Sequence, residues 1–434
     1  MSKSTNEMKK QVRKDSIWRK PWIYLGILAA LIVLAVVAMQ IPAIQSRVRT
    51  AYANIYNRIN RPDEKDFGPS QQSTVSAEVY ATLTAMAPTA TTQPTATEEL
   101  VLADTPVPTS TPFPVPASFA LEGMGLEYQT MNNCGPANLA MNLTYWGWPT
   151  NQSITENAIK THKDDRNVML QEMLDYTEAN TDLKAQLRYG GDIELVKRML
   201  SAGFPVLIER GHSDENDGWM GHYSIVTAYD DATQTVTIPD TLLGMMNMSY
   251  ADLERDWWHF DGIYLVIYPA DRESEVLNLL GKDTDPVENL HRTLEKIERR
   301  IPQVSGQDLF FALYSKGSVL VDMRDYLAAA EAYDQAFAVY NQLDFGLRPW
   351  RITWYQVAPY EAYYYTGRYQ DSFDLAEQTI NNTTFPSLPE TWLWGGRAAL
   401  ALGDKENAIK YFNKALEFYP NWDLANQGLA EAQS

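Results

Sequence analysis

Residues 129–147, QTMNNCGPANLAMNLTYWG, contain Cys134, the only cysteine of the 434-residue chain. Pro136 suits the first turn of a helix and Gly147 its end, and the residues between them recur at helical spacing. We therefore predict a helix that begins directly after Cys134. The unpaired N–H groups and the dipole at such a helix N-terminus stabilise a thiolate, so they lower the pKa of the thiol.

A base for Cys134 lies further along the chain, in a segment that predicts a sheet. Residues 222–240 fit two strands joined by a polar turn, with His222 opening the first and Asp240 ending the second. If the two strands pair as a hairpin, Asp240 lies near His222 and can orient its imidazole. Gln129 can donate its side-chain amide to an oxyanion, together with the backbone N–H of Cys134. In papain-type enzymes the nucleophilic cysteine lies on a helix and the histidine lies on a sheet, and the same arrangement is predicted here.

Three separated pieces of sequence carry a resemblance to a known family. They are QTMNNCGPA at residues 129–137, GHYSIV at 221–226 and IPD at 238–240. In this order they resemble the bacteriocin-processing, or double-glycine, peptidases and their stand-alone relatives, a papain-like family of cysteine peptidases. The resemblance covers about residues 122–269.

The resemblance implies an α+β papain-like peptidase domain and a role for each of four residues. Cys134 would be the nucleophile, His222 the base, Asp240 the residue that orients the base, and Gln129 the oxyanion donor. Two features depart from the family: Thr241 follows the aspartate where many relatives have proline, and no transporter module accompanies the domain.

Other assignments of these residues stay open. His212 is a second candidate base, in the polar and glycine-rich segment 211–219, which we expect to form a loop over the site. Each of the four candidates also has a structural interpretation. Cys134 can be a buried inert thiol and His222 a turn residue. Asp240 can be a cap at the end of a strand, and Gln129 an ordinary surface residue.

The composition of the chain excludes several classes of protein. A formal net charge of −19 with a pI near 4.7 argues against nucleic-acid binding, which needs a surplus of Lys and Arg on one face. A single cysteine rules out an intramolecular disulfide framework and a cysteine-rich metal site. Because His162, His259 and His291 also lack ligand-like spacing, we predict no metal and no cofactor.

The N-terminal part of the chain predicts a membrane anchor. Residues 22–44 carry no charge and would span roughly 35 Å as a helix, enough for the core of a bilayer. Seven Lys and Arg residues precede this segment and only Arg47 and Arg49 follow it closely, which favours a cytoplasmic N-terminus and extracytoplasmic C-terminal domains. A cleaved signal peptide is the alternative.

A segment rich in Pro, Thr and Ser separates this anchor from the globular part, and we expect it to form an extended tether. The whole chain then divides into seven parts: a basic cytoplasmic tail (1–21), a single transmembrane helix (22–44), a membrane-proximal segment (45–65), the tether (66–118), the peptidase domain (119–270), a helical connector (271–304) and helical repeats (305–434).

The repeats are recognised by small and aromatic residues at a fixed spacing. Residues 392–420 closely resemble a tetratricopeptide repeat, through Trp392, Gly396, Ala399, Gly403, Ala408, Phe412, Ala415 and Pro420. An earlier copy at 317–336 and a degraded one at 360–376 predict an all-α, irregular solenoid of about three helix pairs. Such a module provides a docking surface for a protein, and Trp354 and the tyrosines at 360 and 363–365 either anchor the partner or pack between helices.

The sequence therefore predicts a membrane-anchored extracytoplasmic cysteine peptidase that cleaves a peptide or protein substrate through Cys134, His222 and Asp240, with repeats that dock the substrate or a partner. Two alternatives remain. One is a catalytically inactive papain-like domain that acts with the repeats as a binding scaffold. The other is an acyltransferase or cross-linking enzyme, which shares the first half-reaction with hydrolysis.

Overall fold

The computed structural model describes residues 21–38, 48, 51–52, 55–69, 115–214 and 218–434. The chain divides into two compact units, residues 1–56 and residues 57–434. The first unit contains helix α1 (Pro21–Ala38), which lies within the predicted anchor. No helix among the described residues is both long and apolar enough to cross a membrane. The anchor predicted over residues 22–44 thus has no support from the described part, and its last residues, from 39 on, lie outside it.

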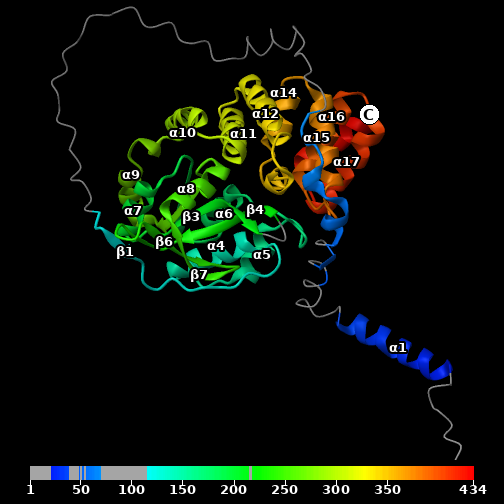
Figure 1. The fold of residues 1–434 in the computed structure, drawn as a ribbon, viewed down its shortest axis with the longest axis horizontal. Coiled ribbons are helices and arrows are strands. Elements are labelled where there is room, and N and C mark those ends of the chain that lie inside the picture. Colours follow the sequence, from blue (N-terminus) through cyan, green and yellow to red (C-terminus); the bar gives the residue numbers. More distant parts are fainter. Residues whose placement is uncertain (1–20, 39–47, 49–50, 53–54, 70–114, 215–217) are drawn as a thin grey trace, which may run out of the picture. The chain divides into compact units, whose positions relative to one another are not determined.

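The second unit begins its globular part with two antiparallel four-stranded sheets (Figure 1). The first has the order β1-β5-β6-β7, and the second has the order β2-β8-β3-β4. The strands of the first sheet are Ser118–Ala120, Ala228–Asp230, Thr235–Asp240 and Gly244–Ser249 in that order. Those of the second sheet are Leu183–Arg188, Tyr264–Pro269, Val206–Asp214 and Gly218–Val226. The chain passes from one sheet to the other at Thr227, between β4 and β5.

Five helices accompany these sheets: α4 (Cys134–Tyr145), α5 (Gln152–Ile159), α6 (Leu170–Asn180), α7 (Ile193–Ser201) and α8 (Tyr250–Trp257). Successive residues of a strand point to opposite faces, so Leu207 of β3 packs with α4 and α6, whereas Ile208 packs with α7 and α8. The second sheet is therefore buried on both faces. The α+β class and the helix predicted directly after Cys134 are confirmed.

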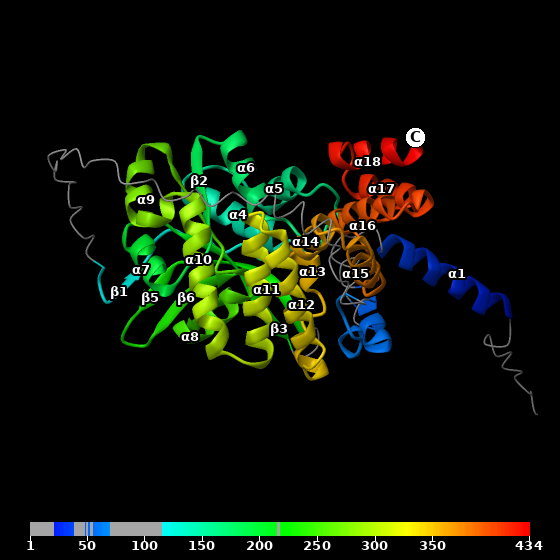
Figure 2. The same cartoon turned by 90° about the horizontal axis from the view of Figure 1, so that it is seen from above.

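The described residues after β8 form helices and short connections (Figure 2). The helices are α9 (Glu273–Leu280), α10 (Pro286–Arg300), α11 (Gly306–Asp322), α12 (Tyr326–Tyr340), α13 (Ile352–Tyr355), α14 (Ala358–Tyr365), α15 (Tyr369–Asn381), α16 (Pro389–Ala401), α17 (Lys405–Phe418) and α18 (Asp423–Gln433). The predicted close approach of helices is present, because a Cβ at Gly396 would lie only 2.9 Å from the Phe412 ring. Tyr360 and Tyr363 are fully buried, so these two rings pack between helices and do not anchor a partner.

A short segment far upstream in the sequence packs on these helices. Phe67 is 2% exposed and its ring lies 5.7 Å from that of Phe337, between ring centroids. The boundary predicted at residue 66, where the tether would begin, therefore falls inside a packed segment, because an aromatic side chain at that point is buried. Most of the predicted tether, residues 70–114, lies outside the described residues.

Candidate active site

Cys134 is the first residue of α4, and side-chain hydrogen bonds hold the start of this helix in place. Asn138, one turn later, donates from Nδ2 to the carbonyl oxygens of Cys134 at 2.9 Å and of Tyr223 at 3.0 Å. The amide thus ties the helix to the strand that carries His222. Gly135 lets the helix lie close to α6, because a Cβ would be 2.8 Å from the Met173 methyl group, which would have to move.

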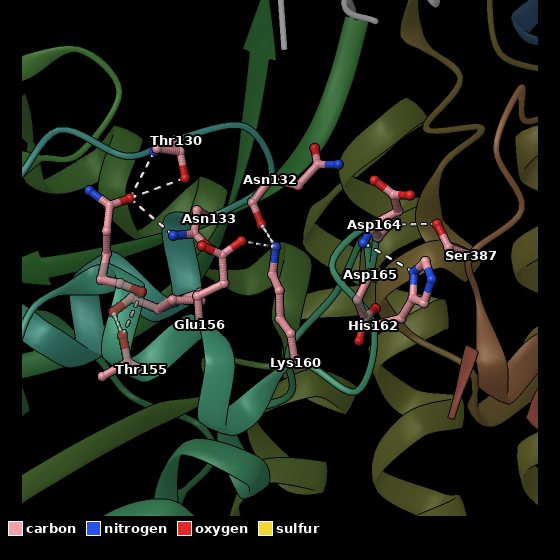
Figure 3. A network of polar contacts seen from close by, with 12 residues as sticks. Thr130, Asn132, Asn133, Thr155, Glu156, Lys160, His162, Asp164, Asp165 and Ser387 are labelled. Carbon is pink, nitrogen blue, oxygen red and sulfur yellow. Dashed lines mark hydrogen bonds and ion pairs between the residues drawn. The ribbon is translucent and has the colours of Figure 1, made fainter. Parts of the chain in front are cut away.

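The loop before Cys134 is held by a buried lysine that the sequence analysis missed. Asn132 adopts a left-handed conformation with φ of 55°, and its carbonyl oxygen accepts a hydrogen bond from Lys160 Nζ at 2.8 Å (Figure 3). Lys160 is only 8% exposed, and burial lowers the pKa of its ammonium. Its position near the thiol also favours the thiolate form of Cys134. A single lysine after a short amphipathic helix gave no signal for this role.

The structure brings Cys134, His222 and Asp240 together. The thiol of Cys134 is hydrogen-bonded to the His222 side chain. His222 Nε2 lies 3.0 Å from Asp240 Oδ2, so the other ring nitrogen, Nδ1, is left for the thiol. Asp240 is completely buried, and its Oδ1 accepts the backbone N–H groups of Leu242 at 2.9 Å and Leu243 at 3.0 Å. Every member of the predicted triad thus has its expected neighbour.

The route by which Asp240 reaches His222 differs from the predicted hairpin. Strand β6 pairs with β5 and β7, whereas β4, which carries His222, pairs with β3 in the other sheet. The contact between histidine and aspartate therefore runs between two sheets. The predicted proximity is correct, and a hairpin does form between β5 and β6, but His222 lies outside it because the chain changes sheets at Thr227.

Arg210 is a further member of the cluster that the sequence analysis did not identify. It lies on β3 directly opposite His222 and is 2% exposed. Its NH2 group donates to Asp240 Oδ2 at 3.0 Å, and its Nε donates to Ser224 Oγ at 3.0 Å. An arginine inside the apolar run PVLIERG was the available signal, since a buried charge needs a partner.

The titration of the three groups is coupled. Burial alone raises the pKa of the Cys134 thiol, but the hydrogen bond and the charge of His222 outweigh it, so that this pKa is lowered. Burial lowers the pKa of His222, yet its bonds to Asp240 and Cys134 raise it to about 8. Burial raises the pKa of Asp240, but the histidine and two backbone N–H groups hold it well below its usual range. Each group thus favours the charged form of the other, the thiolate for Cys134 and the imidazolium for His222.

Gln129 lies beside this cluster and is bound to the residue after Asp240. The Thr241 hydroxyl donates to Gln129 Oε1 at 2.7 Å, and the backbone N–H of Gln129 donates to the Thr241 carbonyl oxygen at 2.9 Å. The predicted oxyanion donor is therefore hydrogen-bonded to the residue that directly follows Asp240.

Comparison with known proteins agrees with this geometry. Residues 121–265 match the model of the Peptidase_C39 like family. Residues 389–422 match the tetratricopeptide repeat. The family resemblance and the final repeat predicted from the sequence are confirmed, whereas the copies predicted at 317–336 and 360–376 have no match of their own.

Solved structures and curated proteins add little to this assignment. A crystal structure described as a C39-like peptidase from Bacillus anthracis is 18% identical, covers 35% of this chain and 98% of its own, and has a TM-score of 0.29. A double glycine motif protease from an AMS/PCAT transporter, in complex with the leader peptide, is 20% identical, covers 35% of this chain and 99% of its own, and has a TM-score of 0.26. No curated protein matches the chain.

His212 of the C39-like domain does not lie in a loop, contrary to the prediction for residues 211–219. It belongs to β3, where it pairs with Met220 of β4, and only residues 215–217 of the segment lie outside the described residues. The loop was predicted from the polar side chains of this segment. Pairing of β3 with β4 satisfies the backbone N–H and C=O groups of both strands whatever their side chains are, so a polar segment can still form a strand. The His212 ring lies 5.9 Å from the His222 ring, between centroids, and the bond to Asp240 belongs to His222.

The helical region also contacts the C39-like domain close to the site. Arg351 donates to the Trp219 carbonyl oxygen at 3.1 Å, and Asn167 donates to the Tyr355 carbonyl oxygen at 3.2 Å. A Cβ at Gly221, next to His222, would lie 2.9 Å from the Tyr355 ring. Figure 3 shows a further contact, in which the Ser387 hydroxyl donates to the Asp164 carbonyl oxygen. The strand that carries His222 is thus packed against helical residues around Arg351 and Tyr355, inside the predicted repeat region 305–434.

Proposed function

We propose that the C39-like domain is a cysteine peptidase that cleaves a peptide bond with Cys134 as nucleophile, His222 as base and Asp240 as the group that orients it. The observation that carries this proposal is the continuous chain of bonds from the thiol to the imidazole and on to a fully buried carboxylate. A buried inert cysteine would need none of these partners.

The geometry supports a two-step reaction. The Cys134 thiolate attacks the scissile carbonyl carbon, and the negative charge that forms on the carbonyl oxygen is held by the backbone N–H of Cys134 and the Gln129 amide. The carbon–nitrogen bond then breaks as the His222 imidazolium gives its proton to the leaving amine. Water, deprotonated by His222, hydrolyses the remaining thioester, which frees the carboxylic acid and restores the thiolate and the imidazolium.

Two measurements on the full-length chain test the proposal. A pool of unstructured decapeptides, analysed by mass spectrometry, should be cleaved by the wild type and left intact by Cys134→Ala and His222→Ala. Alkylation by iodoacetamide should label Cys134 rapidly at pH 6 and much more slowly in His222→Ala, because the imidazolium that lowers the thiol pKa is gone. Cleavage that persists in Cys134→Ala contradicts the proposal, and products that carry an added amine would indicate acyl transfer.

We also propose that the repeats bind an extended peptide or protein segment. The packing of the chain's own residues 65–68 supports this, because side chains of the repeat region bind its backbone. Asn341 accepts from the N–H of Phe67 at 3.0 Å, and Gln378 both accepts from the N–H of Gly68 at 3.0 Å and donates to its carbonyl oxygen at 2.9 Å. A peptide partner can be recognised by the same kind of bond.

The remaining part of the proposal concerns location. We propose that residues 22–44 anchor the chain and that the peptidase domain lies outside the cytoplasm, on the support of the uncharged segment and the excess of Lys and Arg before it. Protease added to intact cells should then remove the C-terminal domains. Complete protection, lost only when the cells are opened, contradicts this location.

A further inference from the structure

Thr241 joins the two halves of the proposed catalytic machinery. It is 1% exposed and follows directly on Asp240, whose carboxylate holds the imidazole of His222. Its hydroxyl donates to Gln129 Oε1 at 2.7 Å, and its carbonyl oxygen accepts the backbone N–H of Gln129 at 2.9 Å. Gln129 is therefore held at both its backbone and its side chain by a single residue.

The hydrogen bond from the Thr241 hydroxyl fixes which way the Gln129 side-chain amide is turned. The amide has an oxygen that only accepts hydrogen bonds and a nitrogen that only donates them, and the two ends exchange places if the group turns over. The Thr241 hydroxyl proton fixes the oxygen end of Gln129. Within the described part of the chain the nitrogen end, Nε2, has no hydrogen-bond partner, so it remains available as a donor.

The orientation of this amide matters in the transition state. A nitrogen that faces the developing oxyanion stabilises it, whereas an oxygen in the same place would repel it. We propose that Thr241 is a positioning residue that keeps the amide nitrogen of Gln129 toward the oxyanion. This inference rests on the proposed function, in which Gln129 is the oxyanion donor.

The turn that carries Thr241 is itself rigid. Asp240 Oδ1 accepts the N–H groups of Leu242 and Leu243, and its Oδ2 binds both His222 and Arg210. Residues 240–243 thus hold the base through one side chain and the oxyanion donor through the next. A proline after the aspartate, as in many relatives, has no hydroxyl to hold the amide.

Two substitutions separate positioning from folding. Thr241→Val removes the hydroxyl and keeps the shape, and we expect it to lower kcat by about tenfold to a hundredfold, below the loss for removal of an oxyanion donor itself, with KM little changed. Thr241→Ser keeps the hydroxyl and should restore kcat to within a few-fold of the wild type. The rate of alkylation of Cys134 by iodoacetamide should be the same in all three proteins, because that reaction builds no oxyanion.

Removal of Gln129 completes the test. In a Gln129→Ala background, Thr241→Val should cause no further loss of kcat, since the two residues act through one amide. The proposal is overturned if Thr241→Val slows alkylation as much as it slows cleavage, if its effect persists without Gln129, or if it leaves kcat unchanged.

The position of the amide can also be read without any activity. The NMR signal of the Gln129 side-chain amide, assigned as the one lost in Gln129→Ala, should shift in Thr241→Val and stay in place in Thr241→Ser. An unchanged signal in Thr241→Val overturns the positioning role. If the wild type cleaves no peptide in the pool, the proposed function is refuted. If the wild type cleaves peptides and Gln129→Ala leaves kcat unchanged, only the role of the Gln129 amide is refuted.

Discussion

Glu209 and Arg210 are neighbours on β3 that are buried on opposite faces of the sheet, with exposures of 7% and 2%. Arg210 keeps its charge, because Asp240 and Ser224 bind its guanidinium. Glu209 has no such cation. Burial raises the pKa of its carboxyl well above the ordinary value, and the hydroxyl of Tyr223 is its hydrogen-bond partner. One face of the strand therefore carries a paired ion, and the other carries a neutral acid.

The comparison shows how burial acts on a charge. A charge with a partner keeps its ionised form, and the loss of that partner leaves the other group buried and unpaired. A carboxyl without a cation takes up a proton, so its replacement by a neutral group of the same shape changes little. The paired face is the one that carries His222 and lies against Asp240 of the other sheet. Substitutions on the two faces should therefore differ in size and in dependence on pH.

Arg210→Met should have the largest effect. It leaves Asp240 buried without its guanidinium partner, and we expect the free energy of unfolding to fall by about 3–5 kcal/mol, measured by urea denaturation. The matched control is Arg255→Met, because Arg255 also pairs with an aspartate but has a side chain that is 47% exposed. The control should lose less than about 1 kcal/mol. Equal losses in the two variants would show that burial does not set the cost.

Asp240→Asn should act on the reaction as well as on the fold, because the buried Arg210 also loses its carboxylate partner. The carboxylate and the Cys134 thiol together raise the pKa of His222 to about 8, so loss of the carboxylate lets that pKa fall and makes the imidazolium beside the thiolate less stable. In the wild type the pair of Cys134 thiolate and His222 imidazolium exists above the lowered pKa of Cys134. It is lost as the pH rises through the pKa of His222. The alkaline limb of kcat/KM should therefore move to lower pH, with a loss of about a hundredfold near pH 8.

The pH profile of the exposed-site variant Asp252→Asn is the control for Asp240→Asn, since Asp252 has a side chain that is 48% exposed. Its alkaline limb should coincide with that of the wild type. If the alkaline limb of kcat/KM does not shift in Asp240→Asn, then Asp240 does not raise the pKa of His222, whatever the distance between the two side chains.

The sequence predicted the parts of the site that follow from local pattern. The helix after Cys134 came from proline and glycine at its ends, and the order of Gln129, Cys134, His222 and Asp240 came with the family resemblance. These features depend on neighbours along the chain. The same holds for the final repeat, in which Gly396 and Phe412 have a fixed spacing.

The partners of the buried groups could not be predicted, because they depend on register and on contacts between sheets. Glu209 and Arg210 are adjacent in the sequence, and nothing local decides which one meets Asp240 and which one meets Tyr223. Thr241 was visible only as a departure from the family pattern, and its bond to Gln129 appears once residues 112 positions apart are placed together. The assignment of His212 to a loop failed for the same reason, since β4 supplies the pairing.

Ser224→Ala tests the hydrogen bond from Arg210 to Ser224, the weaker of the two side-chain contacts discussed above for the Arg210 guanidinium. The change leaves Arg210 Nε, a buried donor, without its acceptor at 3.0 Å, and we expect a loss of about 1.5 kcal/mol in the free energy of unfolding. A double-mutant cycle provides the control, because Ser224→Ala should cost close to nothing once Arg210→Met has removed the donor. Additive losses in the double variant would show that Ser224 stabilises the sheet by some other contact.

Glu209→Gln should have the smallest effect, and that effect should depend on pH. The folded state binds the proton of Glu209 more tightly than the unfolded state, whose ordinary pKa is 4.5, because burial disfavours the carboxylate. This contribution to stability is present below pH 4.5 and is lost as the pH rises toward the pKa of the folded state. Glutamine has no proton to lose. The variant should therefore match the wild type at acid pH and become the more stable of the two as the pH rises.

Urea denaturation at a series of pH values measures the difference between Glu209→Gln and the wild type. Glu194→Gln is the control, because its side chain is 68% exposed and remains in solvent in the folded state. Its difference from the wild type should not follow the same curve. If Glu209→Gln instead loses stability at every pH, as a broken ion pair does, then Glu209 carries a charge, and the contrast between the two faces of β3 does not hold.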